Sequence, residues 1–316
     1  MSVGSYLLRR TGGLVLVLLV TSFLVFGLLY LAPGSPLAFI LGPRGGTPEQ
    51  IAMVTEQYHL DDPFVVRYAA WLGDILRGDL GYSIVYRQDV SALISGRVGT
   101  TLALVSMAAI IIAVVGIGAG TFAALRGGWG DQLTSTFAAV GLSTPSFVIG
   151  VALISVFAVG LGWFPTFGSG TGGVDTLWHL TLPAIALSVA SAAYLARITR
   201  AAVLEESGRE HVQTATVRGL APQRIVRHHV LRNSLIPIVT VLGLTIATLI
   251  AGAVVIENVF ALDGLGSLLV RAILQRDFAV VQAVILVLVV AFVVVNAIVD
   301  FLYTFIDPRI ALGSRQ

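Results

Sequence analysis

Six stretches of the chain are apolar and nearly free of charge over the length that a helix needs to cross a membrane. Such a helix needs about 20 mostly apolar residues. The gaps between charged residues locate the predicted spans at residues 12–32, 101–124, 135–161, 180–196, 237–256 and 278–304. The hydrophobic pattern therefore predicts an all-α integral membrane protein with six transmembrane helices.

The segments outside the spans differ greatly in length. Residues 33–100 form a long segment after the first span, residues 101–304 would form the core, and residues 1–11 and 305–316 flank the spans. Apolar residues from Val65 to Leu76 recur at helical spacing, which predicts an amphipathic interfacial helix with Trp71 at headgroup level. A small lid packed on the outer ends of the helices is the alternative.

The composition agrees with a membrane protein and excludes several kinds of chemistry. Only 11% of the residues are charged, against roughly 25% in ordinary soluble domains. The chain has no cysteine, which excludes disulfides and Cys-ligated metal sites. It also has no lysine, and the ordinary P-loop needs a lysine to reach the nucleotide phosphates. We predict no catalytic residue, metal site or cofactor site in this chain.

The arginines predict the orientation in the membrane. If both termini are cytoplasmic, twelve of the 19 basic residues lie on the cytoplasmic side and only Arg271 and Arg276 lie in the short outer loops. This distribution follows the positive-inside rule. We therefore expect a multi-pass protein of the cytoplasmic membrane, with residues 33–100 outside and the loop at residues 197–236 inside.

The predicted spans contain no ionisable residue near their middle. A charge there costs about 2.5–3.5 kcal/mol, so such residues usually have a role. Their absence argues against a gradient-driven carrier, whereas a passive channel, a pump with a separate motor and a non-transporting scaffold remain open. Pro145 is a candidate for a bend in the third span, and Gly116, Gly118 and Gly120 predict close helix packing or, alternatively, a subunit contact.

Several hydroxyl groups within the spans could line a solute path. Each could instead make a hydrogen bond between helices. The candidates are Ser143, Ser146, Ser188, Ser191, Thr245 and Thr248.

The loop at residues 197–236 has its own helical signals. Residues 210–218 can form a short helix, with Gly219 after its end at positive φ and Pro222 in the first turn of the next helix. A short cytoplasmic helix held between two membrane helices is suited to transmit force from a soluble partner. His211, His228 and His229 are not predicted to bind metal, because the adjacent His228 and His229 would point to different helix faces.

The same loop resembles the EAA loop of ABC-importer permeases. It reads Gln213-Thr214-Ala215-x-x-x-Gly219, followed after nine residues by His229-x-Leu231; the family pattern is E-A-A-x-x-x-G, nine residues, I-x-L-P. The departures resemble the dipeptide/oligopeptide/nickel branch, in which T-A-x-x-x-G-L and R-H-x-L-R-N-x-L-I-P are usual.

Further stretches resemble the first permease subunit of that branch. They are L-A-P-G-S-P at residues 31–36, G-D-L-G-Y-S at 78–83, P-S-F at 145–147, and V-V-I-E-N-V-F at 254–260 followed by G-L-G at 264–266. Ser35 replaces the usual Asp, and Asp263 stands where Pro is usual.

The resemblance implies a type I ABC importer permease that moves short peptides by alternating access, with a nickel-type permease as the alternative. It implies a second homologous permease subunit, two ATPase domains that bind ATP and magnesium, and an extracytoplasmic binding protein. The chain itself would not be an enzyme. The residues expected to couple to the ATPase are Glu210, Gln213, Thr214, Ala215, Arg218, Gly219 and Leu220, and those expected to contact the binding protein are Trp71, Asp79 and Asp263.

Overall fold

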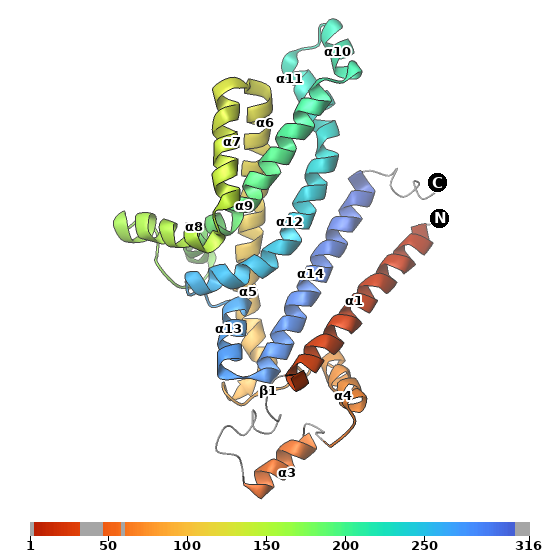
Figure 1. The fold of residues 1–316 in the computed structure, drawn as a ribbon, viewed down its shortest axis with the longest axis vertical. Coiled ribbons are helices and arrows are strands. Elements are labelled where there is room, and N and C mark those ends of the chain that lie inside the picture. Colours follow the sequence, from red (N-terminus) through yellow and green to blue (C-terminus); the bar gives the residue numbers. More distant parts are fainter. Residues whose placement is uncertain (1–2, 32–46, 58–60, 307–316) are drawn as a thin grey trace. The chain divides into compact units, whose positions relative to one another are not determined.

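The computed structural model describes residues 3–31, 47–57 and 61–306, most of which are helical. The chain divides into two compact units (Figure 1). The first is formed mainly by residues Thr100–Leu262, and the second by Ser2–Gly99 with Asp263–Val293. The L-A-P-G-S-P stretch beyond Leu31, including Ser35, lies outside the described residues.

The first unit is built around one long helix, α9 (Gly173–Ser207). It contacts α6, α7, α8 and α12, and side chains of α5, α9 and α12 form its apolar core, including Leu104, Leu195 and Ile256 (Figure 1). Segments labelled η are π-helical turns within or beside the α-helices. The elements of this unit besides α9 are α5 (Val90–Ile111, from Thr100 on), η1 (Ile112–Gly116), α6 (Ile117–Arg126), α7 (Gly128–Ser143), α8 (Ser146–Leu153), η2 (Ile154–Gly160), α10 (Glu210–Val217), α11 (Pro222–Ile225), η3 (Val226–Leu231) and α12 (Arg232–Val259).

The second unit contains the residues from the predicted outer segment and the start of the last helix. Its elements are α1 (Val3–Leu31), α3 (Pro48–Gln57), α4 (Phe64–Leu76), β1 (Tyr82–Ser83), β2 (Gln88–Asp89), the first turns of α5, α13 (Leu265–Gln275) and the first part of α14 (Phe278–Ile306). β1 and β2 pair antiparallel. An apolar cluster joins α5, α13 and α14 through residues such as Leu93, Leu268 and Val284.

The amphipathic helix predicted before residue 77 is confirmed as α4. Its aromatic residues pack on α1, because the ring centroids of Trp71 and Phe26 lie 5.2 Å apart and those of Phe64 and Phe23 lie 5.4 Å apart. The Tyr68 hydroxyl also hydrogen-bonds Ser22 of α1 at 2.8 Å. Within this unit, α4 is therefore held by side-chain packing against α1, and the choice between an interfacial helix and a lid stays a prediction.

Four stretches among the described residues are long and apolar enough to cross a membrane. They are Val90–Arg126, Gly173–Ser207, Pro222–Val259 and Phe278–Ile298, and each covers all or most of one predicted span. Thr11–Gly27 of α1 is a shorter apolar helix. The structure thus confirms an all-α protein with several membrane-spanning helices, while the count of six stays a prediction.

The predicted third span, residues 135–161, consists of two helices in the structure. The stretch Gly128–Ser143 is bent by 105° against Ser146–Gly160. Thr144 and Pro145 both have extended backbone angles, because a proline disfavours the helical conformation of the residue before it and cannot donate the next helical hydrogen bond. The two helices together form a broken span or a re-entrant segment.

Two of the three clustered glycines permit close helix packing. A Cβ at Gly116 would lie 2.8 Å from the Leu195 Cβ, and one at Gly120 would lie 2.6 Å from the Thr199 Cβ. Among the described residues, no atom outside its own stretch of helix lies within 4 Å of a Cβ built at Gly118. The packing prediction is therefore confirmed for Gly116 and Gly120, which lie four residues apart and face α9.

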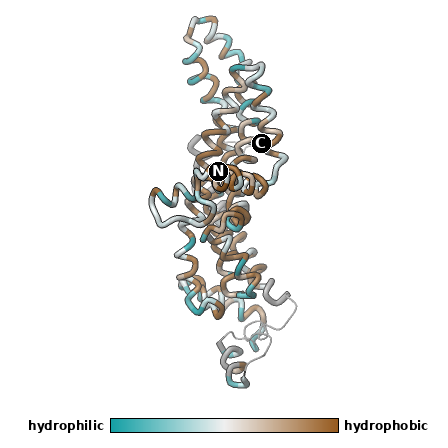
Figure 2. The backbone as a smooth tube through the Cα atoms, turned by 90° about the vertical axis from the view of Figure 1, so that its left-hand side faces the viewer, coloured by the Kyte–Doolittle hydropathy of each residue, from teal (hydrophilic) through white to brown (hydrophobic). Residues whose placement is uncertain are grey.

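The loop predicted at residues 197–236 is largely helical. Helix α9 continues to Ser207, α10 and α11 follow, and η3 leads directly into α12. Hydrophilic positions gather at the α10 end of the first unit, whereas its long helices are mainly hydrophobic (Figure 2).

Candidate functional site

Helix α10 contains most of the residues predicted to couple to an ATPase. Val212 and Ala215, three residues apart, are buried against Val203, Ile225 and Val230. The other side of the helix is exposed, including Glu210, Gln213, Thr214 and the following Arg218 and Gly219. The helix is therefore attached to its own unit by one narrow apolar face and offers the remaining surface to solvent or to another molecule.

The end of α10 has the geometry that the sequence predicts. Gly219 has a φ of +74°, a conformation that costs other L-residues roughly 1–2 kcal/mol. The Leu220 N–H donates to the Ala215 carbonyl at 3.2 Å, and the Gly219 N–H donates to the Thr216 carbonyl at 3.0 Å. These two bonds define a Schellman motif. Pro222 then begins α11 in its first turn, as predicted.

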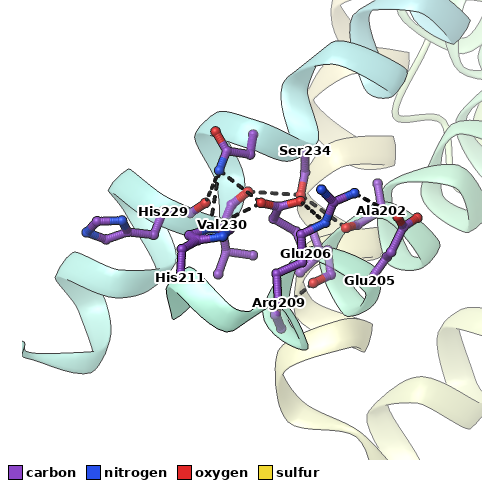
Figure 3. Close-up of polar contacts among 11 residues, drawn as sticks. Ala202, Glu205, Glu206, Arg209, His211, His229, Val230 and Ser234 are labelled. Atoms are coloured by element: carbon purple, nitrogen blue, oxygen red, sulfur yellow. Dashed lines mark hydrogen bonds and ion pairs between the residues drawn. The ribbon is translucent and has the colours of Figure 1, made fainter. Parts of the chain in front are cut away.

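A buried carboxylate at the end of α9 joins the other end of α10 to the rest of the unit. The Glu206 side chain is 10% exposed. Arg209 Nε lies 3.0 Å from Glu206 Oε2, and His211 Nε2 lies 3.2 Å from Glu206 Oε1 (Figure 3). Asn233, in the first turn of α12, donates its Nδ2 hydrogen to Glu206 Oε1 at 2.9 Å. We name these four residues the Glu206 cluster.

The sequence does not single out the Glu206 cluster. Glu205 and Glu206 are adjacent, and both sit in a helical pattern that is typical of a solvated helix end. The partner Asn233 is 27 residues away and is brought close only by the return of the chain through α10, α11 and η3. From the sequence, His211 is considered only as a metal ligand, and nothing there connects it with Glu206.

Four of the six candidate pathway residues line one pocket. The pocket has a volume of about 360 Å³ and lies beside the break between α7 and α8. Ser143 and Ser146 flank the break, Ser191 comes from α9, and Thr248 comes from α12. Residues that carry hydroxyl groups and apolar residues such as Leu187 therefore line the same space, although the Thr248 hydroxyl also donates to the Thr245 carbonyl at 2.7 Å. Such a lining suits an uncharged polar group of a solute.

The other two candidates lie within the helix packing. The Ser188 hydroxyl is buried and donates to the Ile185 carbonyl at 2.9 Å. The Thr245 hydroxyl donates to the Val241 carbonyl at 2.7 Å. Both bonds are made within the residue's own helix, and neither residue is among those that line the pocket.

The residues predicted to contact a binding protein all belong to the second unit. Trp71 packs on Phe26. Asp79 is exposed and accepts a hydrogen bond from the Gly81 N–H at 2.8 Å, which fixes the turn after α4. The Asp263 carboxylate lies 3.4 Å from Arg97 Nε. Asp79 and Asp263 therefore present carboxylate oxygens close to the surface.

A second buried carboxylate lies at the end of α12. Glu257 is fully buried and accepts a hydrogen bond from the Thr101 hydroxyl of α5 at 2.6 Å. The sequence places this glutamate just beyond the predicted span at residues 237–256, but α12 continues to Val259. An acidic residue inside an apolar helix is a functional candidate by default, and this rule could have identified it.

The apolar helices and the exposed α10 helix define a membrane protein with a free helical surface at one end of its first unit, and comparison with known proteins identifies its family. Residues 116–312 match the family described as "Binding-protein-dependent transport system inner membrane component", and residues 3–105 match the N-terminal region of such components. The chain belongs to this family, which confirms the resemblance drawn from its sequence motifs.

Relatives match almost the whole chain. A probable peptide ABC transporter permease of Sinorhizobium fredii is 39% identical over 97% of this chain and 99% of its own length. A glutathione transport system permease of Escherichia coli is 38% identical over 97% of this chain and 98% of its own length.

Solved structures share the fold. An inward-facing form of the MetNI methionine ABC transporter has a TM-score of 0.56 at 21% identity and covers 68% of this chain and 96% of its own. A structure described as an amino acid ABC transporter with histidines has a TM-score of 0.53 at 17% identity, over 67% of this chain and 94% of its own.

Proposed function

We propose that this chain is a membrane-spanning subunit of an ATP-driven importer for short peptides. The observation that supports this most directly is α10, an exposed helix attached by one apolar face at the polar end of the first unit. Relatives of nearly full length carry the names of a peptide and a glutathione permease, and glutathione is itself a short peptide.

The ATP would be hydrolysed by partner subunits. Two ATPase domains, which bind ATP and magnesium, would receive α10, and their closure and reopening would move α10 and with it the helices of the first unit. This division fits a chain without lysine, since an ordinary P-loop needs one. We assign no enzymatic role to this chain.

The solute would pass along a path shared with a second, homologous permease subunit. In this chain the proposed path includes the pocket lined by Ser143, Ser146, Ser191 and Thr248. Hydroxyl groups can bond the amide groups of a peptide backbone without requiring a charged residue in the membrane. An extracytoplasmic binding protein would deliver the solute, with Trp71, Asp79 and Asp263 as proposed contacts.

The orientation follows from the arginines. We place both termini and α10 in the cytoplasm, since seven arginines lie within residues 197–236. Residues 33–100 then lie outside, where a binding protein would dock.

The solute class is tested by uptake into proteoliposomes that contain the complete importer. Labelled dipeptide, labelled tripeptide and nickel ions are offered separately with the binding protein, with ATP or with a non-hydrolysable analogue. The proposal predicts ATP-dependent peptide uptake that unlabelled peptide reduces and nickel does not. ATP-dependent nickel uptake without peptide uptake would instead support the nickel-type alternative.

A further inference from the structure

The Glu206 cluster spans the short link between α9 and α10. Helix α9 ends at Ser207 and α10 begins at Glu210, so only two residues separate them. Glu206 lies before this link, while Arg209 lies within it and His211 lies in the first turn of α10. The carboxylate thus adds polar contacts across a link that is also held by apolar packing of Val212 and Ala215 against Val203 of α9.

The same carboxylate also binds α12. The Asn233 Nδ2 group donates to Glu206 Oε1 at 2.9 Å and lies 2.9 Å from the His229 carbonyl oxygen as well. Beside it, the Ser234 hydroxyl approaches the Ala202 carbonyl of α9 at 3.2 Å (Figure 3). Three elements, α9, α10 and α12, therefore meet at one acidic side chain.

A buried carboxylate of this kind contributes little to stability on balance. Moving a charge from water into the protein costs free energy, and interactions with its partners offset this cost only when their geometry is good. An apolar residue would fill the space as well, but it would not fix the directions of three separate elements. The contrast with Glu205 is clear, since the Glu205 side chain is 73% exposed and, within the part of the chain that the structure describes, forms an ion pair with Arg209 alone, at 2.9 Å.

Helices α9 and α12 both run from the Glu206 cluster to the pocket. Ser191 precedes Glu206 by about 15 residues on α9, and Thr248 follows Asn233 by about 15 residues on α12, which corresponds to roughly 22 Å along each helix. A displacement at α10 that reaches both helices through one carboxylate would move both walls of the pocket in step.

We propose that Glu206 is a positioning residue that ties α10 to both α9 and α12, so that force on α10 reaches the two walls of the pocket together. This inference rests on the proposed function. The role is mechanical: Glu206 touches neither nucleotide nor solute. It is expected to set how much solute is moved per ATP rather than how fast ATP is hydrolysed.

The test measures peptide uptake and ATP hydrolysis in the same proteoliposomes of the complete importer. Glu206→Ala removes every contact of the carboxylate, Glu206→Gln keeps an acceptor for Asn233, and Glu205→Ala is the matched control on the adjacent residue. Removing a partner from a hydrogen bond to a charged group changes an equilibrium by about tenfold or more. We expect Glu206→Ala to lower peptide moved per ATP about tenfold, Glu206→Gln to lower it less, and Glu205→Ala to leave it unchanged.

A merely structural role gives a different result. If Glu206→Ala only weakens folding, uptake and hydrolysis fall together with the amount of assembled complex and their ratio stays constant, which overturns the proposal. Should Glu206→Ala not assemble, Asn233→Ala decides, because Asn233 is exposed and its loss removes the bond from α12 while the contacts of Glu206 with Arg209 and His211 stay in place. A normal ratio in Asn233→Ala would then overturn the proposal.

A double-mutant cycle between Glu206 and Asn233 adds a check on the direct contact. The double variant Glu206→Ala/Asn233→Ala should be no worse than Glu206→Ala alone, because both changes remove the same tie. If the two substitutions instead lower the peptide moved per ATP by factors that multiply in the double variant, the two side chains do not act through their direct contact. If the wild-type importer moves no peptide, the proposed function fails, and the same variants are then compared by how far the binding protein stimulates hydrolysis.

Discussion

At the scale of single residues, Gly219 and Glu206 constrain the two ends of α10 by different physical means. Gly219 acts through its backbone, because its φ of +74° is strained for other residues while the space around it is open among the described residues. Glu206 acts through its side chain and three partners. One end of α10 is therefore set by local chain geometry and the other by tertiary contacts.

Substitution of Gly219 tests the backbone requirement. We expect Gly219→Val to lower peptide uptake per ATP severalfold, because a β-branched residue at positive φ strains the Schellman motif by about 1–2 kcal/mol or more. Gly219→Asn is the matched control, since Asn tolerates this conformation. Equal ratios of uptake to hydrolysis in Gly219→Val and wild type would show that the cap has no part in coupling.

The contrast between these residues also shows what a sequence can predict. The roles of Gly219 and Pro222 are local, so the order of residues suffices to predict the cap and the start of α11. The pairs Glu206–Asn233 and Thr101–Glu257 join residues 27 and 156 positions apart, and they exist only once the helices have packed. Charge spacing located the apolar spans for the same local reason, and Pro145 indicated a bend in the third span. Neither could give the angle of 105° or the extension of α9 to Ser207.

At the scale of elements, the first unit depends on close packing of α6 against α9. Gly120 permits this approach, because a Cβ there would lie 2.6 Å from the Thr199 Cβ and would also meet the Ala196 carbonyl oxygen. Backbone atoms cannot move aside as the end of a flexible side chain can. The separation of the two helices is thus set by the absence of a side chain.

Paired glycine variants test this packing. Gly120→Val should lower the thermal stability of the purified importer and the amount recovered, since overpacking typically costs about 1–3 kcal/mol. Gly118→Val, two residues away, should change stability little, because no atom of the described residues outside its own helix lies within 4 Å of a Cβ there. Thermal unfolding in detergent measures both. A Gly120→Val protein as stable as the Gly118→Val protein would contradict the packing described above.

The pocket between α7, α8, α9 and α12 allows a test of the solute path. Ser191→Leu should reduce peptide uptake strongly, because a larger apolar side chain would occupy part of the roughly 360 Å³ and remove a hydroxyl group. Ser191→Ala removes the hydroxyl alone and should reduce uptake less. Uptake by Ser191→Leu at the wild-type rate, in a correctly assembled importer, would place the path elsewhere.

At the scale of the whole molecule, the scarcity of charge and the absence of cysteine both have experimental consequences. The arginines predict which side of the membrane each exposed segment occupies, and a chain without cysteine accepts single reporter thiols without background from its own sequence. The exposed residues Val217 of α10 and Leu76 of α4 are suitable positions.

Labelling with a membrane-impermeant thiol reagent tests the orientation. When this chain is produced without the ATPase subunits, which would cover α10, Val217→Cys should react in inside-out vesicles and stay unlabelled in spheroplasts, whereas Leu76→Cys should react in spheroplasts. Labelling of both residues from the same side would contradict the proposed topology.

The central claim is that this chain provides the solute path and is driven by ATPase domains on other subunits. The most direct measurement is peptide uptake into proteoliposomes that contain both permease subunits and the binding protein, with the ATPase subunits either present or left out. The account predicts uptake against a gradient only when the ATPase subunits and ATP are present. Concentrative uptake without the ATPase subunits would contradict it.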